Sequence, residues 1–240
     1  MKVFILGHSG MLGSIVSKYL AGNDIDILTT PERWPSLPFQ DAVKNTRCDY
    51  LINCIGSIPQ KRDDFKVNYE LPVWLDESLG HRIIHPGTDC EIDEDEYGIS
   101  KRRASSYLME RGVRTKIIQS SIIGPEISGH VGLFEWFMRS NTEVAGWTGS
   151  KWNGITTLQW AKICYSMMRQ WKNYNSLTVP STDCISKFEL LTIIRDVFDK
   201  DINIVPEFNE NLNKCLNGNY TVPNIRTQLL ELKTFIDDCY

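Results

Sequence analysis

The chain has 240 residues, of which 42% are hydrophobic and 23% are charged, and its formal net charge is −4. These values are ordinary for a soluble protein with one large domain or a domain with a small lobe. The acidic balance argues against a nucleic-acid partner, and no apolar run is long enough for a secretory signal or a membrane span. We therefore expect a cytoplasmic protein without a nucleic-acid or membrane partner.

The cysteines carry no recognisable pairing or metal-binding spacing. There are seven, an odd number without a CxxC pair: Cys48, Cys54, Cys90, Cys164, Cys184, Cys215 and Cys239. Without an export signal we expect all of them to be reduced thiols. HExxH and EF-hand patterns are absent from the sequence as well, so we expect no metal site.

The first half of the chain alternates between strand and helix patterns. Lys2–Leu6 predicts a buried strand, and apolar residues at helical spacing then predict a helix that stops at Gly22. Further strands are predicted at Ile25–Thr29, Tyr50–Cys54, Arg82–His85 and Lys116–Gln119, with a proline-rich loop after the first of these and helices around 71–79 and 97–111. This alternation predicts an α/β fold with a Rossmann-type, doubly wound parallel sheet.

The pattern changes after about residue 124. Aromatic residues are frequent over 133–160, and helices are predicted at about 156–171 and 186–198. The second of these begins with a capping box formed by Ser186 and Glu189. We expect residues 1–124 to form a dinucleotide-binding Rossmann domain. Residues 125–240 should form a smaller C-terminal α/β substrate lobe, some segments of which return to the Rossmann sheet.

Three glycines follow the first predicted strand. Gly7, Gly10 and Gly13 form G-x-x-G-x-x-G between that strand and its helix. Small residues there let the backbone approach a pyrophosphate, and the helix N-terminus supplies free N–H groups and a positive potential. The pattern favours a dinucleotide site, although a tight turn with close helix packing would need the same glycines.

The end of the second predicted strand bears on the choice between NAD and NADP. NAD-specific sites usually place a carboxylate there for the ribose hydroxyls, but this chain has Thr29 and Thr30, with Arg33 shortly after. A missing carboxylate and a nearby arginine favour the 2′-phosphate of NADP(H) over NAD(H). The alternative is that Arg33 is a solvated loop residue.

Tyr97 and Lys101 are four residues apart, so a helix would place both on one face. A tyrosine could donate a proton to a carbonyl oxygen as hydride reaches the carbon, but its ordinary pKa of about 10 is high for that role. We expect the ammonium one turn away to lower this pKa. Thr88 follows the fourth strand, at the edge of the sheet where ligands bind in such folds, and offers a hydroxyl.

Together these features resemble the extended short-chain dehydrogenase/reductase family, and especially its dTDP-4-dehydrorhamnose reductase branch. The segments that carry the likeness run in family order over nearly the whole chain: "GHSGMLG", "YLINCIGSI", "VNYELP", "GTDC", "YGISK", "SSIIGPE", "GLFEWF", "WNGITTLQWAK" and "ISKFELL". The resemblance implies NADPH-dependent reduction of a nucleotide-linked 4-keto-6-deoxyhexose in deoxysugar and surface-glycan synthesis. It also implies homodimers as an option.

The resemblance assigns roles to individual residues. It implies Thr88, Tyr97 and Lys101 as the catalytic trio. The residues implied to bind the cofactor phosphates are Gly7, Ser9, Gly10, Met11 and Leu12, and those along its adenosine and ribose are Asn53, Cys54, Ile55 and Gly56. Trp152 and Asn153 would face the nucleotide sugar, although aromatic clusters belong to the core more often than to a binding site.

The chain departs from the family pattern between Thr88 and Tyr97. Members of the family carry a longer segment there, whereas this chain has only the eight residues 89–96, six of which are carboxylates. Negative charge is favourable at the start of the following helix but would repel a nucleotide diphosphate at the mouth of a site. The shortening leaves open a subunit that binds NADP without catalysis.

Cys90, in the same segment, adds a second alternative. In related epimerase-reductases a cysteine near this position moves protons beside the ketone, which would make the chain a bifunctional 3,5-epimerase and 4-reductase. The other interpretation of Cys90 is a small apolar residue that packs after a strand.

Overall fold

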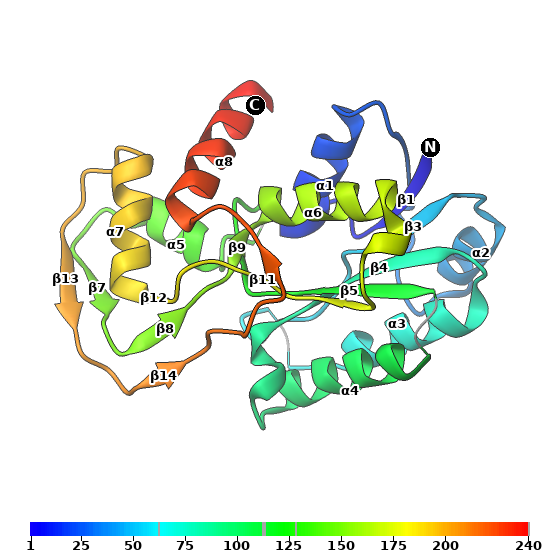
Figure 1. Ribbon diagram of the computed structural model, residues 1–240, viewed down its shortest axis with the longest axis horizontal. Helices are drawn as coiled ribbons and strands as arrows, with labels where there is room; N and C mark the ends of the chain where they lie inside the picture. The colour runs from blue at the N-terminus through cyan, green and yellow to red at the C-terminus, as the bar shows by residue number, and fades with distance from the viewer. Residues whose placement is uncertain (62, 112–113, 128, 240) are drawn as a thin grey trace.

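A six-stranded parallel sheet forms the centre of the larger part of the molecule (Figure 1). The structure, a computed structural model, describes residues 1–240 except 62, 112–113, 128 and 240. The sheet order is β10-β5-β4-β3-β1-β2, with the strands β1 (Lys2–Leu6), β2 (Asp26–Thr29), β3 (Tyr50–Asn53), β4 (Arg82–Gly87), β5 (Thr115–Gln119) and β10 (Leu177–Thr178). The predicted doubly wound α/β fold is confirmed.

Helices cover both faces of this sheet, which explains its continuous apolar strands. Figure 1 shows α1 (Met11–Ala21) and α6 (Thr157–Arg169) on one face, and α3 (Val67–Ser78) and α4 (Glu96–Arg111) on the other. Strand residues that point either way are therefore buried, as the run Val3–Leu6 is. One core cluster joins the sheet to α1 and α6, and another joins it to α3 and α2 (Leu37–Asn45).

A smaller lobe lies beyond one end of the sheet (Figure 1). Its helices are α5 (Leu133–Arg139), α7 (Lys187–Val197) and α8 (Ile225–Cys239). Its strands are β7 (Val144–Trp147) paired with β13 (Ile204–Glu207), and β8 (Ser150–Trp152) paired with β12 (Ile185–Ser186) and β14 (Leu212–Asn213). A third core cluster fills this lobe.

Short elements connect the two parts. They are β6 (Ile122–Ile123) with β9 (Ile155–Thr156), β11 (Pro180–Ser181) with β15 (Tyr220–Thr221), and the 3₁₀ helices η1 (Asp89–Ile92) and η2 (Trp171–Asn173). Both α6 and β10 belong to the second half of the chain and join the first-half sheet and its core. Among the described helices, none combines the length and apolarity needed to cross a bilayer.

Three helices, α2, α5 and α8, were absent from the sequence prediction. The stretch read as a proline-rich loop includes the start of α2, where Ser36 accepts the Phe39 N–H at 3.2 Å and Pro38 occupies the first turn. Proline fits there because the first N–H groups of a helix have no partner within it. Helix α8 was missed as well, and α3 begins four residues before the predicted range, with Pro72 inside it.

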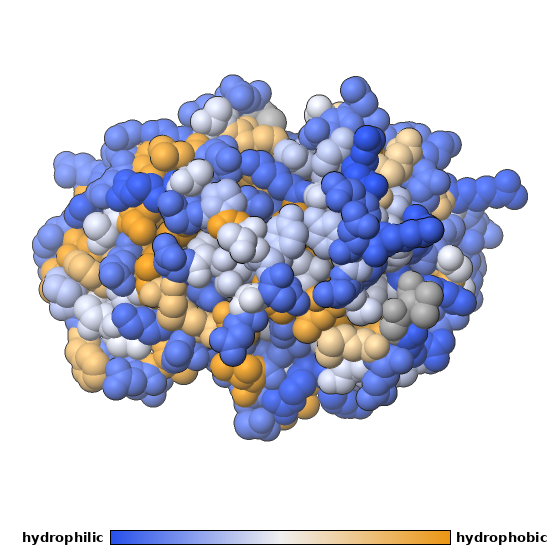
Figure 2. Space-filling view, in the orientation of Figure 1, coloured by the Kyte–Doolittle hydropathy of each residue, from blue (hydrophilic) through white to orange (hydrophobic). Residues whose placement is uncertain are grey.

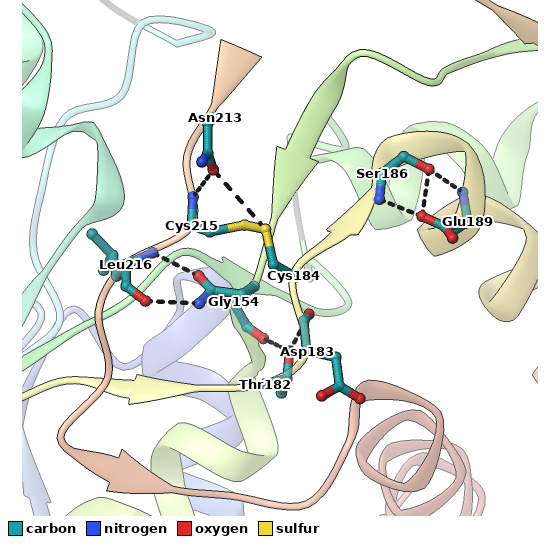
Figure 3. The surroundings of a disulfide bond; sticks show 10 residues. Gly154, Thr182, Asp183, Cys184, Ser186, Glu189, Asn213, Cys215 and Leu216 are labelled. Carbon is teal, nitrogen blue, oxygen red and sulfur yellow. Dashed lines mark hydrogen bonds between the residues drawn. A yellow bond between two sulfur atoms is a disulfide. The ribbon is translucent and has the colours of Figure 1, made fainter. Parts of the chain in front are cut away.

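The prediction of seven reduced thiols is wrong for two cysteines. Cys184 and Cys215 form a disulfide across a sequence separation of 31 residues (Figure 3). They meet because β12 and β14 both pair with β8, an arrangement that no local sequence pattern reveals. The free cysteines among the described side chains are Cys48, Cys54, Cys90 and Cys164.

Candidate functional site

A cavity of about 450 Å³ lies at the carboxyl ends of β1, β3, β4 and β5, against the smaller lobe. The sheet order reverses direction between β1 and β3, and ligands of open α/β sheets bind in the crevice at such a switch point. A more open hollow of about 560 Å³ lies at the opposite edge, around Met1, Asp49 and His81. We place the site in the first cavity because it holds the predicted catalytic trio.

The glycine turn leaves an open cradle at the start of α1. Gly7 has φ +75°, and a Cβ there would lie 2.9 Å from the Cys54 carbonyl oxygen. A Cβ on Gly13 would lie 2.1 Å from the Gly7 carbonyl oxygen, so these two glycines permit the turn and the close helix. Gly10 is different, because it is exposed, caps the helix and would place a Cβ in ordinary contact, 3.4 Å from the Gly7 carbonyl oxygen. This backbone fits a cofactor pyrophosphate.

The predicted cofactor residues divide into those that line the cavity and those that do not. The lining residues are Gly10, Met11, Leu12, Cys54, Ile55 and Gly56. Gly7, Ser9, Gly13 and Asn53 lie outside the lining. Asn53 is fully buried, where its side chain accepts the Ile55 N–H at 3.0 Å and contacts His85 Nδ1 at 3.2 Å. It therefore shapes the turn after β3.

Arg33 lies apart from the cavity. It is exposed in the loop between β2 and α2 and does not line the site. Its contact with a 2′-phosphate stays a prediction.

Thr88, Tyr97 and Lys101 all line the cavity. Thr88 follows β4 and caps η1, while Tyr97 and Lys101 lie one turn apart on α4. The Lys101 ammonium donates a hydrogen bond to the Pro86 carbonyl at 2.6 Å. The Thr88 hydroxyl donates to the Asp89 carboxylate at 3.1 Å. A proton donor, a cation and a hydroxyl thus converge on one space.

The expected lowering of the Tyr97 pKa is wrong for this structure. Burial raises the pKa of Tyr97, and nearby Cys90, Asp89 and Glu91 raise it further, although a hydrogen bond with Thr88 acts in the other direction. Burial also lowers the pKa of Lys101 to about 8, against the opposing effect of Glu91. For both pKa values, the effect of burial is larger than the effect of the Tyr97–Lys101 pairing that the spacing predicted.

Several carboxylates of the acidic segment have partners within the protein. Asp89 and Glu91 are buried beside Thr88, whereas Glu94 pairs with Arg102 at 3.2 Å and Asp93 pairs with Lys214. Asp95 accepts the Gly98 N–H at 2.6 Å and so caps α4. Asp93 and Glu94 therefore serve as ion-pair partners and Asp95 as a cap, so these three carboxylates do not form an unpaired acidic rim.

Cys90 lines the cavity as a half-buried thiol. Its Sγ donates to Asp89 at 3.7 Å. Burial, reinforced by the Asp89 charge, raises the pKa of Cys90 to about 12. At neutral pH the group is a thiol, which can donate a proton but is a weak base or nucleophile.

The two residues predicted to bind substrate do not line this cavity. Trp152 is 1% exposed within the core of the smaller lobe. Asn153 is 6% exposed and exchanges two hydrogen bonds with the Leu216 backbone, each of 2.9 Å. The structure therefore favours the core interpretation of Trp152 and a structural role for Asn153.

Sequence reasoning missed three charged residues of the cavity wall. Lys187, the first residue of α7, projects beside the Trp152 ring at 5.3 Å from its centroid. Lys61 pairs with the buried Glu126 at 2.9 Å, and Glu126 also accepts the Gly132 N–H at 2.6 Å. The capping box before Lys187 was the nearest available signal. Within the described part of the chain, no group of three or more His, Cys, Asp or Glu residues is placed to hold a metal ion.

Comparisons with known proteins agree with this architecture. No protein-family model and no curated protein matches the chain. A dTDP-4-dehydrorhamnose reductase structure from Clostridium acetobutylicum is 16% identical with a TM-score of 0.74, over 99% of this chain and 100% of that one. The same enzyme from Bacillus anthracis, in complex with NADP, is 14% identical with a TM-score of 0.74, over 98% and 99%.

A UDP-glucose 4-epimerase structure from Thermotoga maritima, with UDP-glucose, is 14% identical with a TM-score of 0.73 and covers all of both chains. At these identities the likeness concerns the fold. The resemblance drawn from the sequence is confirmed at that level: the chain has the fold of dTDP-4-dehydrorhamnose reductases and related short-chain dehydrogenase/reductase epimerases.

Proposed function

We propose that the protein is an NADPH-dependent reductase of a nucleotide-linked 4-keto-6-deoxyhexose. The observation that carries this proposal is the convergence of Thr88, Tyr97 and Lys101 in one cavity, next to the open cradle at Gly10. Fold similarity to sugar-nucleotide reductases and epimerases supports the substrate class.

The residues of the site would share the work of reduction. A bound nicotinamide would supply hydride to the carbonyl carbon. Tyr97 gives its phenolic proton to the keto oxygen, so that ketone, hydride and proton become the alcohol. The raised pKa of Tyr97 keeps it protonated at neutral pH, which is the form that donates. Thr88 turns its hydrogen bond from Asp89 to the keto oxygen, and Lys101 stabilises the phenolate that remains.

Lys187 is our candidate partner for the substrate diphosphate. It comes from the smaller lobe, lines the cavity and makes no ion pair within 4 Å among the described residues. Burial lowers the pKa of Lys187, while Asp89 and Cys90 raise it. A diphosphate would provide the direct counter-charge that the ammonium lacks.

For the cofactor we propose NADP(H) over NAD(H). The support is the absence of a carboxylate at Thr29 and Thr30 together with the position of Arg33 in the following loop. The structures similar to this chain include one in complex with NADP and one complexed with NADPH.

The assay that tests this function is NADPH oxidation after addition of freshly generated dTDP-4-keto-6-deoxyglucose. We expect substrate-dependent loss of absorbance at the reduced-nicotinamide band, faster with NADPH than with NADH. Omission of the sugar nucleotide is the control. NADPH binding without any turnover on dTDP- or UDP-linked substrate would contradict the proposal and favour a subunit that binds the cofactor without catalysis.

A further inference from the structure

We propose that Lys61 and Glu126 form a salt bridge across the rim of the cavity that retains the bound cofactor. Their side chains lie 2.9 Å apart, and both residues line the cavity. The inference rests on the proposed function only in that it takes NADPH as the ligand. It concerns the rates at which the cofactor enters and leaves, and not the chemical step.

The salt bridge joins two walls of the cavity that are distant in the chain. Lys61 ends the run 54–61 after β3, every residue of which lines the cavity. Glu126 lies 65 residues further on, between β6 and α5, and residues 131–134 at the start of α5 line the cavity as well. Side chains rather than backbone therefore connect the two walls at this point.

Glu126 is the fixed half of the salt bridge. Its side chain is 2% exposed, and Oε1 accepts the Gly132 N–H at 2.6 Å while Oε2 accepts the Lys61 ammonium. Its own N–H donates to Glu135 Oε1 at 3.1 Å. A Cβ on Gly132 would lie 2.6 Å from Glu126 Oε1 and 3.8 Å from Met11 Sδ. The carboxylate is thus anchored beside the first residue of α1, where the glycine cradle lies.

Lys61 is the half that can detach. Its side chain is 40% exposed, so water can hydrate the ammonium when the lysine stem rotates away from Glu126. Gly129 has φ +98°, and a Cβ there would lie 3.0 Å from Lys61 Cε. This glycine therefore leaves room for the stem against the segment before α5. The salt bridge can open through one side chain, without rearrangement of the core.

The position of the salt bridge determines what its opening would change. Gly10 and Met11 of the cradle line the same cavity as Lys61 and Glu126, so a cofactor bound at the cradle lies against the walls that the salt bridge connects. An intact salt bridge opposes separation of these walls. We therefore expect it to slow both entry and release of the cofactor.

A direct contact between Lys61 and a cofactor phosphate is the alternative role, and it predicts different signs. In that case Glu126 competes with the phosphate for the ammonium, so loss of the Glu126 charge would slow cofactor release and loss of Lys61 would speed it. The salt bridge predicts faster release after loss of either partner. It also predicts no further effect when both are lost, because the two changes remove the same interaction.

The experiment measures NADPH release from the whole protein by stopped-flow fluorescence, with excess NADP⁺ as the displacing ligand. The variants are Lys61→Met, Glu126→Gln, which keeps an acceptor for the Gly132 N–H, and the double variant. We expect the dissociation rate constant to rise roughly three- to tenfold in each single variant and no further in the double variant. The association rate constant should rise in the same variants. Unchanged or slower release from Glu126→Gln, or effects that multiply in the double variant, would overturn the proposal.

Lys162→Met is the matched control. Lys162 pairs with Glu231 at the same distance of 2.9 Å, but this pair joins α6 to α8 and neither residue lines the cavity. The variant should release NADPH at the rate of the parent protein. Acceleration equal to that in Lys61→Met would reveal a general effect of lost charge and would overturn the proposal.

A second measurement works without any cofactor. Exchange of the Gly132 amide with heavy water can be followed by NMR in protein made with isotope-labelled glycine. Lys61→Met leaves the Glu126 acceptor of this N–H in place, so faster exchange reports separation of the walls rather than loss of the bond. We expect exchange roughly three- to tenfold faster in Lys61→Met and unchanged in Lys162→Met. If NADPH does not bind at all, the proposed function fails but this exchange still tests the salt bridge, and an unchanged rate in Lys61→Met would overturn it.

Discussion

Protonation of single residues decides which chemistry the cavity can support. Tyr97 is held in its protonated form by burial and neighbouring carboxylates, whereas Lys101, with a pKa of about 8, remains mostly cationic at neutral pH. A proton donor next to a cation is the arrangement that carbonyl reduction needs. Cys90 shares the cavity, but its raised pKa of about 12 keeps it a neutral thiol. Reduction therefore requires no change in the ionisation of these groups. Epimerisation by a thiolate base would require Cys90 to lose its proton.

The neutral state of the Cys90 thiol predicts whether solvent hydrogen enters the product. In heavy water we expect reduction of the keto sugar without deuterium at the carbons beside the ketone, because a neutral thiol is a poor base. Mass spectrometry and NMR of the product would measure the incorporation. Deuterium that appears with the parent protein and disappears in Cys90→Ser would contradict this expectation and establish the bifunctional epimerase-reductase.

At the scale of elements, the turn between β1 and α1 combines structural glycines with Gly10, which we propose lies against the cofactor. Gly13 lets α1 pack against the Gly7 carbonyl, while Gly10 leaves space at the start of the helix. The motif thus contains a fold requirement at Gly13 and a proposed binding requirement at Gly10. Substitution by alanine separates the two because the surroundings of the added methyl group differ.

We expect Gly13→Ala to lower the free energy of unfolding by roughly 2 kcal/mol or more, since its Cβ would overlap the backbone of Gly7. Gly10→Ala should fold normally, with a nearest contact of 3.4 Å, but should bind NADPH more weakly because the methyl group enters the cradle. Urea unfolding and NADPH fluorescence titration would measure the two effects. Gly80→Ala, with nothing within 4 Å, is the control. Equal stability of Gly13→Ala and Gly80→Ala would refute the assignment.

Local patterns explain which elements and site residues could be predicted. β1 and α4 could be predicted because the pattern of each lies within a short stretch of sequence: an apolar run for β1 and a helical spacing for α4. Likewise, Thr88 follows a strand, and Tyr97 and Lys101 share a helix face. The start of α2 was not predicted because Pro38 favours a loop in sequence-based prediction, although a proline also fits the first turn of a helix.

Long-range contacts could not be predicted in the same way. Lys187 enters the cavity only because the smaller lobe folds against the end of the sheet. Burial raises the pKa of Tyr97, and the Phe65 ring, 5.7 Å from the Tyr97 ring, is a contact distant in sequence. The four-residue spacing to Lys101 therefore predicted the wrong direction for this pKa. The disulfide depends on strand pairing through β8.

At the scale of the whole molecule, a disulfide within the smaller lobe lies next to an ion pair that joins this lobe to the acidic segment beside the site. The disulfide fixes Cys215 against the start of β12, and the adjacent Lys214 pairs with Asp93 of the acidic segment. Figure 2 shows that apolar residues on the face in view are scattered among hydrophilic ones. The homodimer stays a prediction.

Loss of the disulfide should weaken the fold of the smaller lobe. A closed loop of this length, 31 residues, corresponds to about 3–4 kcal/mol in the chain-entropy description. We expect Cys184→Ser, or the parent protein in dithiothreitol, to unfold at lower urea concentration. Cys48→Ser, which removes a free thiol, is the matched control. Identical urea midpoints with and without reductant would show that the disulfide contributes nothing to stability.

The most direct test of the account is the Tyr97→Phe variant, because the phenolic proton is the centre of the proposed reduction. We predict that its NADPH affinity stays close to that of the parent protein while kcat falls by about 10²–10⁴-fold. Tyr107→Phe is the matched control on the same helix, since its hydroxyl bonds the exposed Glu77 outside the cavity at 2.6 Å. Undiminished turnover by Tyr97→Phe would contradict the account, and the proton donor would have to be sought elsewhere in the cavity.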